Sequence, residues 1–178
     1  VAIIQTVLND KNNKFIIFLA MHMNISNNLK EFLENKKIDK ITDTSIANYL
    51  GISKKTLSNY VNGDAYIPLN HLNKLSNLFD VSIDYLIGLT DKENYKDNIK
   101  IDSLDPISIG QRLKETRKNL KVSQEQVAHI IGVNKSSISR YEHGETLILT
   151  ICLYTFCQKY NISSDYIIGK NKNCILIE

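Results

Sequence analysis

The side chains best placed to do chemistry are hydrogen-bond donors on one face of a short helix predicted over residues 135–142. The opposite face is apolar, because Ile138 and Tyr141 follow each other at helical spacing, and no acid precedes Glu142. A face of this kind can enter a DNA major groove and offer donors to base edges and phosphates. The donors are Lys135, Ser136, Ser139 and Arg140.

Local signals predict the elements that position this face. Ser123 and Gln126 form a capping box at the start of a preceding helix, and Gly132 suits the left-handed residue that ends it. Asn134 is placed to cap the donor-bearing helix. Ala128 is small where the two helices are expected to cross. The sequence therefore predicts two short helices joined by a tight turn.

This unit occurs twice in the chain. Residues 47–88 and 128–169 match at a constant offset of 81 without a gap, with 13 identities in 42 positions. Chance gives roughly three identities, so the match indicates an internal duplication. Each copy is long enough for one small helical domain.

The second copy resembles the Cro/lambda-repressor type of helix-turn-helix, the XRE family, from Ile109 to Gly144 and again at S-x-D-Y-I-I-G over 163–169. The resemblance implies an all-α fold, with two tandem five-helix lambda-repressor-like DNA-binding domains joined by a polar linker. It implies that Gln124 binds a DNA phosphate. It also implies an internal salt bridge between Arg117 and Glu142, a structural role. Base or nearby phosphate contact is implied for Asn134, Lys135, Ser136 and Arg140.

The first copy departs from this pattern at several positions. Asp43 stands at the position of Gln124, where a carboxylate would repel a phosphate, and Lys36 and Val61 replace the salt-bridge pair. Asn59 remains suited to reading adenine in a bidentate manner. The polar face still compatible with DNA consists of Ser53, Lys54, Lys55, Ser58 and Asn59.

The repeat also suggests domain boundaries. We expect an N-terminal extension over 1–25, a first domain over 26–88 whose first helix Ser26 caps, and a linker over 89–106. A second domain follows over 107–170, with a tail over 171–178. Two interpretations of the extension stay open: the natural start is Met21 or Met23 and the residues before it are not native, or the extension is a packing or dimerisation arm.

Charge is unevenly distributed although the net charge is only +3. The first copy is neutral over 28–88, the linker region 89–108 carries −2, and the second copy carries +4 over 109–170. Attraction to phosphate is therefore concentrated in the second copy. The nine-residue apolar run 15–23 is too short to span a bilayer.

No catalytic constellation, metal-ligand spacing or cofactor loop is recognisable, so we predict neither an enzyme nor a cofactor. The cysteines are interpreted as buried hydrophobes in a reducing cytosol, and the protein is expected to be cytoplasmic and nucleoid-associated. The repeated pairs Asp84–Tyr85 and Asp165–Tyr166 are interpreted as caps and anchors of each copy's final helix.

The leading hypothesis is a sequence-specific regulator of transcription, a repressor of a phage, mobile-element or bacterial operon. It binds double-stranded DNA at an asymmetric or pseudo-palindromic operator, either as one chain or as a homodimer. In a second hypothesis only the second copy binds DNA, and the first copy or the tail meets a protein partner. A third is a protein-directed inhibitor or adaptor on the same fold, such as a phage antagonist or an antitoxin.

Overall fold

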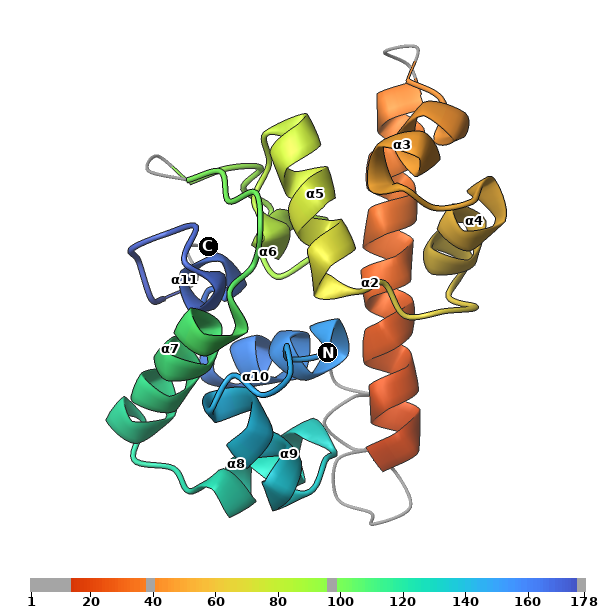
Figure 1. The fold of residues 1–178 in the computed structure, drawn as a ribbon. Helices are drawn as coiled ribbons and strands as arrows, with labels where there is room; N and C mark the ends of the chain where they lie inside the picture. The colour runs from red at the N-terminus through yellow and green to blue at the C-terminus, as the bar shows by residue number, and fades with distance from the viewer. Residues whose placement is uncertain (1–13, 38–40, 96–98, 176–178) are drawn as a thin grey trace.

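The computed structural model describes residues 14–37, 41–95 and 99–175, and within them the architecture is all-helical (Figure 1). The first five helices are α2 (Lys14–Lys37), α3 (Asp43–Leu50), α4 (Lys54–Asn62), α5 (Leu69–Phe79) and α6 (Ile83–Leu86). The next five are α7 (Pro106–Asn119), α8 (Gln124–Ile131), α9 (Lys135–Glu142), α10 (Thr150–Tyr160) and α11 (Ser164–Ile168). Two five-helix units in tandem confirm the predicted fold class.

The ends of the helix pairs follow the local sequence signals in both copies. Thr42 and Ser123 form capping boxes at the starts of α3 and α8, and Asn134 accepts from the backbone N–H of Ser137 at the start of α9. Gly51 and Gly132 end α3 and α8 with φ of 75°. Such left-handed residues suit glycine, so each helix stops where the turn must begin.

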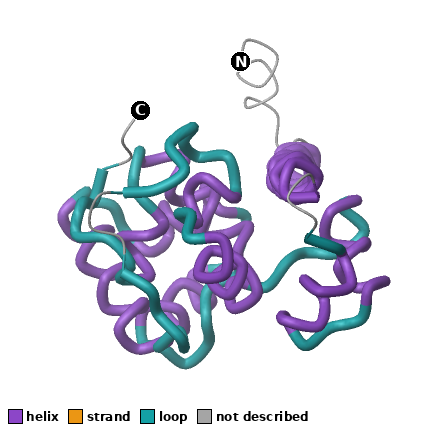
Figure 2. The backbone as a smooth tube through the Cα atoms, turned by 90° about the horizontal axis from the view of Figure 1, so that it is seen from above, coloured by secondary structure: helices purple, strands orange, loops and turns teal. Residues whose placement is uncertain are grey.

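The first helix differs from the prediction. α2 runs without a break from Lys14 to Lys37, so Ser26 lies inside the helix, is 2% exposed and does not cap its start. The expected cap was wrong because the apolar run 15–23 continues as the same helix. Figure 2 views α2 nearly along its axis, with α3 and α4 on one side of it and the larger helical mass on the other. Residues 1–13 of the expected extension lie outside the described residues.

The region expected to be a polar linker is partly packed against the helices. Tyr95 is 6% exposed and Leu104 is 8% exposed, and the carbonyl of Ile101 accepts hydrogen bonds from the amides of Asn73 and Asn77 at 2.6 and 2.8 Å. The linker was predicted because the stretch is polar and acidic and ends at Pro106. The structure instead attaches this region to α5.

The two copies meet at their final helices, α6 and α11. The carboxylate of Asp84, in α6, accepts from the backbone N–H of Ser164 in α11, and the carboxylate of Asp165 accepts from the backbone N–H of Ile83 in α6. Each copy's own final helix is capped by a serine, Ser82 or Ser163. The predicted role is thus corrected, because each aspartate caps the final helix of the other copy.

Candidate nucleic-acid interface

The donor face of α9 is open to solvent. Lys135, Ser136 and Arg140 are exposed, and Ser139 is half-buried with its hydroxyl 3.3 Å from Nδ1 of His143. The apolar side of the same helix is buried through Ile138 and Tyr141. The helix therefore presents its donors outward while its core residues fix its position.

The side-chain oxygen of Asn134 already accepts hydrogen bonds from the N–H of Ser137 and from the hydroxyls of Ser136 and Ser137. The bond from the N–H of Ser137 measures 2.8 Å and that from the hydroxyl of Ser136 measures 2.7 Å. A contact with DNA at this position therefore falls to the amide nitrogen of Asn134. The hydroxyl of Ser136 must likewise give up its hydrogen bond to Asn134 before it can donate to a phosphate or a base.

A charged network under α9 links it to α7 and α8. Arg117 in α7 donates from Nε and Nη2 to the two carboxylate oxygens of Glu142, at 2.5 and 3.0 Å, and Gln124 donates to Oε2 of the same carboxylate at 2.8 Å. The side chains of Arg117 and Glu142 are 12% and 0% exposed. Burial raises the pKa of Glu142, but the bonds from Arg117 and Gln124 outweigh it and hold the pKa below its usual value.

The network leaves Gln124 one side-chain hydrogen with which it can bind a ligand. One amide hydrogen of Gln124 goes to Glu142, and the second remains available to a phosphate at the start of α8. The bidentate Arg117–Glu142 pair fixes the crossing of α7 and α9, because this geometry allows little rotation. The expected salt bridge is present in the structure.

Arg140 must separate from Glu145 before its guanidinium can contact DNA. Its Nε lies 3.6 Å from Oε2 of Glu145, and both side chains are more than half exposed. An exposed pair of this kind contributes little energy, so a phosphate or a guanine can replace the carboxylate. No sequence pattern indicated Glu145, because it follows the end of α9 and shares no helical face with Arg140.

The corresponding face of α4 is smaller. Lys54 and Lys55 are exposed, whereas Ser58 and Asn59 are only half-exposed, and the hydroxyl of Ser58 accepts from Nδ2 of Asn62 at 3.1 Å. Ser53 is the N-cap of α4 and accepts from the backbone N–H of Thr56. The two lysines are therefore the readily accessible cations of this helix.

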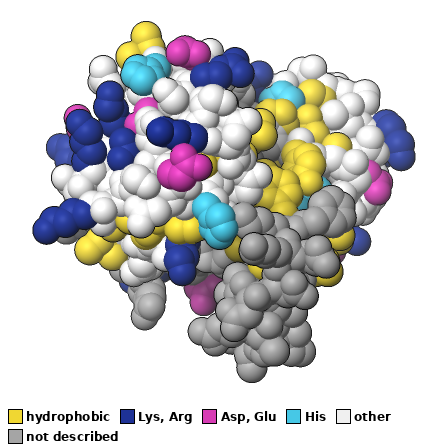
Figure 3. Space-filling model, turned by 90° about the horizontal axis from the view of Figure 1, so that it is seen from below, with side chains coloured by type: hydrophobic (Ala, Val, Ile, Leu, Met, Phe, Trp, Pro, Cys, Tyr) yellow, Lys and Arg dark blue, Asp and Glu magenta, His cyan; other side chains and the backbone are white. Residues whose placement is uncertain are grey.

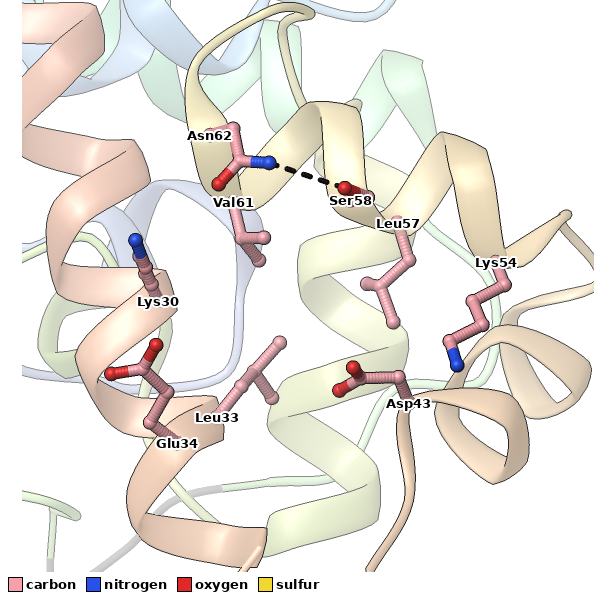
Figure 4. A pocket seen from close by; sticks show the side chains of 9 residues that line it. All are labelled: Lys30, Leu33, Glu34, Asp43, Lys54, Leu57, Ser58, Val61 and Asn62. Atoms are coloured by element: carbon pink, nitrogen blue, oxygen red, sulfur yellow. Dashed lines mark hydrogen bonds between the residues drawn. The ribbon is translucent and has the colours of Figure 1, made fainter.

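A cavity of about 240 Å³ lies in the first copy where the second copy holds its charged network. Figure 4 shows its walls: Lys30, Leu33 and Glu34 from α2, Asp43 from α3, and Lys54, Leu57, Ser58, Val61 and Asn62 from α4. Asp43 and Val61 stand at the positions of Gln124 and Glu142. The lining thus includes the counterparts of two of the three residues that form the charged network in the second copy.

Basic side chains gather on the second copy. Figure 3 looks from the end of the molecule that carries α8 and α9, and most of the Lys and Arg side chains in view lie on the half formed by the second copy. Among the described residues no group of three or more His, Cys, Asp or Glu could hold a metal ion, and no helix is long and apolar enough to cross a membrane.

Comparison with known proteins supports the assignment of both copies. The family described as "Helix-turn-helix" matches residues 29–86, and the family described as "Helix-turn-helix domain" matches residues 110–172. The chain therefore belongs to the helix-turn-helix proteins. More particularly, it contains two tandem domains of the Cro/lambda-repressor, or XRE, type.

Three curated relatives match part of the chain. Antitoxin PezA of Streptococcus pneumoniae is 38% identical over 64 residues, 36% of this chain and 40% of that protein. The HTH-type transcriptional regulator ImmR of Bacillus subtilis is 32% identical over 66 residues, 37% and 52% of the two chains. The uncharacterized HTH-type transcriptional regulator YobD of the same species is 38% identical over 61 residues, 34% and 54%. The matches thus span about half of each relative or less, and no solved structure matches the chain significantly.

Proposed function

We propose that the protein is a sequence-specific double-stranded DNA-binding regulator of transcription, acting as a repressor. In this proposal α9 lies in a major groove and α4 lies in a second one. Lys135, Ser136 and Arg140 contact bases or nearby phosphates, and the free amide hydrogen of Gln124 binds a phosphate. Two relatives named as HTH-type transcriptional regulators support this class of function.

The observation that carries the proposal is the rigid presentation of the donor face. α9 is capped by Asn134, and its last residue is held by the Arg117–Glu142–Gln124 network. Reading of base edges depends on donors held in fixed positions, since misplaced donors lose the bidentate geometry that distinguishes bases. An exposed helix used only for solubility has no need for such a buried ionic support.

Selection of bound duplexes from a random DNA library tests the proposal. Wild-type protein is expected to enrich a defined sequence, and Arg140→Ala and Asn59→Ala are each expected to lose preference at different positions of it. Lys121→Ala, at an exposed lysine outside both donor faces, serves as the control and should retain the full preference. Recovery of no enriched sequence by the wild type contradicts the proposal.

A second candidate is that only the second copy binds DNA and the first copy binds a protein. The cavity beside Asp43 and the replacement of the charged network's residues by Lys36, Asp43 and Val61 favour it. The similarity to a protein named as an antitoxin is also compatible with it. Under this candidate, Asn59→Ala leaves the selected sequence unchanged, and Arg140→Ala alone alters it.

A further inference from the structure

The contact between α6 and α11 has the symmetry of a dimer although it lies within one chain. Ile83 and Ser164 are equivalent in the repeat, and each donates its backbone N–H to the aspartate of the opposite copy, at 3.1 and 2.7 Å. Asp84 and Asp165 are themselves equivalent and 0% exposed. Exchanging the two copies therefore reproduces the same pair of hydrogen bonds.

The symmetry continues beyond the helices. The backbone N–H of Ser82 donates to the carbonyl of Glu93 at 2.6 Å, and the backbone N–H of Ser163 donates to the carbonyl of Cys174 at 2.8 Å. Both bonds obey the offset of 81. The segments that follow the final helices thus fold back in the same way, although they share no identical residues at this offset between 89–95 and 170–176.

Further buried bonds hold the two copies in one relative position. Lys170, 1% exposed, donates from Nζ to Oγ of Ser76 and Oδ1 of Asn77 in α5. The hydroxyl of Thr150 donates to the carbonyl of Ile67 at 2.7 Å. Buried polar groups that lose their partners cost free energy, so these contacts oppose sliding or separation of the copies.

The N-terminal half of α2 adds a second link. Sδ of Met21 lies 3.2 Å from the hydroxyl oxygen of Thr155 in α10, and the ring of Phe18 lies 4.0 Å from the position of a β-carbon at Gly132. One helix of the first copy therefore packs against α10 and the helix-turn-helix turn of the second. The copies are joined at two separate places.

We propose that the chain is a closed intramolecular pseudo-dimer that occupies a two-half-site operator as a single copy. The inference rests on the proposed function and deepens it by naming the partner: duplex DNA with two unlike half-sites at one fixed spacing. The final helices cannot pair with a second chain while Asp84 and Asp165 are buried against each other's copies. The unlike faces of α4 and α9 then give the two half-sites different sequences.

Fixed spacing distinguishes this arrangement from two domains on a flexible tether. A rigid pair reads half-sites only at the separation set by its interface, which for dimers of this motif is about one helical turn or a multiple of it. Linking two binding units raises affinity by roughly 10²–10⁴-fold only when both can engage together. Loss of the correct spacing must therefore reduce affinity to that of the better single domain.

The experiment uses the full chain and the duplex recovered by the library selection. We expect a monomer in sedimentation equilibrium, a complex of one chain with one duplex, and protection of two major-groove segments. Inserting about half a helical turn of DNA, roughly 5 bp, between these segments should weaken binding by on the order of 100-fold. Asp165→Ala should reduce this discrimination, whereas Asp91→Ala, at an exposed aspartate, should preserve it.

Each alternative result has a distinct meaning. Two chains on one duplex, protection of a single segment, or equal affinity for both spacings overturns the pseudo-dimer and leaves the DNA-binding proposal intact. Failure of the wild type to enrich any sequence overturns the DNA-binding proposal and this inference with it. If Asp165→Ala does not fold, the stoichiometry and spacing dependence of the wild type still decide the question.

Discussion

Asp84 and Asp165 occupy the same position in the two repeats, and each carboxylate caps the final helix of the opposite copy. The two are not equal in their surroundings, because Asp84 also accepts from the hydroxyls of Ser163 and Tyr95, at 2.6 and 2.7 Å. Asp165 accepts two backbone N–H groups, those of Ile83 and Asp84. The two carboxylates therefore occupy symmetric positions in the interface but accept different sets of hydrogen bonds.

Replacing Asp84 should destabilise the whole chain. Asp84→Ala leaves the backbone N–H of Ser164 and the hydroxyls of Ser163 and Tyr95 buried without their acceptor. Loss of charged hydrogen bonds of this kind costs on the order of 3 kcal/mol of unfolding free energy. Urea denaturation measures it, with Asp91→Ala as the exposed control, and equal stability of the two variants contradicts the structural role of Asp84.

The buried carboxyl group of Asp165 should make stability depend on pH. Burial and the neighbouring charge of Asp84 raise the pKa of Asp165 to about 8, from 3.8, against the opposing effect of its two backbone donors and Lys170. Because the folded pKa is raised, the associated stability is complete below about pH 4, falls as pH rises and is lost once pH passes about 8. Tyr95, Cys157 and Lys170 also face this pair.

Asp165→Asn isolates this contribution. The variant cannot ionise at this position, so the decline of its unfolding free energy between pH 5 and pH 8 should be shallower than that of the wild type. Urea titrations at several pH values measure the slope rather than the absolute stability, so the lost acceptor in asparagine does not affect the comparison. Parallel slopes contradict a raised pKa for Asp165.

The Arg117–Glu142 pair should be replaceable only as a unit. Glu142→Val alone leaves a largely buried guanidinium without its carboxylate, which costs roughly 3–5 kcal/mol of unfolding free energy. Adding Arg117→Lys reproduces the pair found in the first copy, Lys36 and Val61, and should recover part of this loss. A double-mutant cycle in urea measures the coupling, and strictly additive effects contradict it.

The salt dependence of DNA affinity should show whether α4 contacts phosphates. Lys54→Ala combined with Lys55→Ala should flatten the slope of log affinity against log salt by about two units, since each lost phosphate contact removes roughly 0.9. Lys92→Ala with Lys100→Ala, away from both donor faces, is the charge-matched control. An unchanged slope in the α4 variant assigns DNA binding to the second copy alone.

The sequence predicted the elements whose determinants are local. Ser123, Gly132 and Asn134 define the ends of α8 and α9 within a few residues, so these could be assigned without a structure. The contact of Asp84 with Ser164 spans 80 residues and depends on how two domains dock, which no local pattern encodes. For the same reason Lys170 was not recognised as an interdomain residue.

The start of α2 shows a different limit. Ser26 has the residue type of a cap, but the helix extends upstream of it, and Phe18 and Met21 in that extension contact the second copy. Whether an apolar run joins a helix depends on the surface available to cover it. In this chain part of the covering surface belongs to the other domain, so the sequence of the first copy alone favoured the wrong boundary.

Gly110 should not tolerate a side chain, because it lies where two helices cross. A β-carbon there would lie 2.2 Å from the carbonyl oxygen of Tyr141 and 3.0 Å from the carbonyl carbon of Glu142, where α7 crosses α9. Backbone cannot move aside as a flexible side chain can, so Gly110→Ala should cost roughly 1–3 kcal/mol or more through forced separation of the two helices. The first copy has Leu29 at this position, so its own helices cannot approach as closely.

Gly51→Ala serves as a comparison variant, because it introduces backbone strain without a steric clash. Gly51 has φ of 75° but no atom within 4 Å of a β-carbon, so its replacement should cost only about 1 kcal/mol, the left-handed conformation being the sole penalty. Gly110→Ala should also weaken DNA binding, because displacing α7 pulls Arg117 away from Glu142 and loosens α9, whereas Gly51→Ala should leave contacts of the second copy unchanged. Urea denaturation and affinity for the selected duplex test both effects, and equal behaviour of the two variants contradicts the role assigned to the α7–α9 crossing.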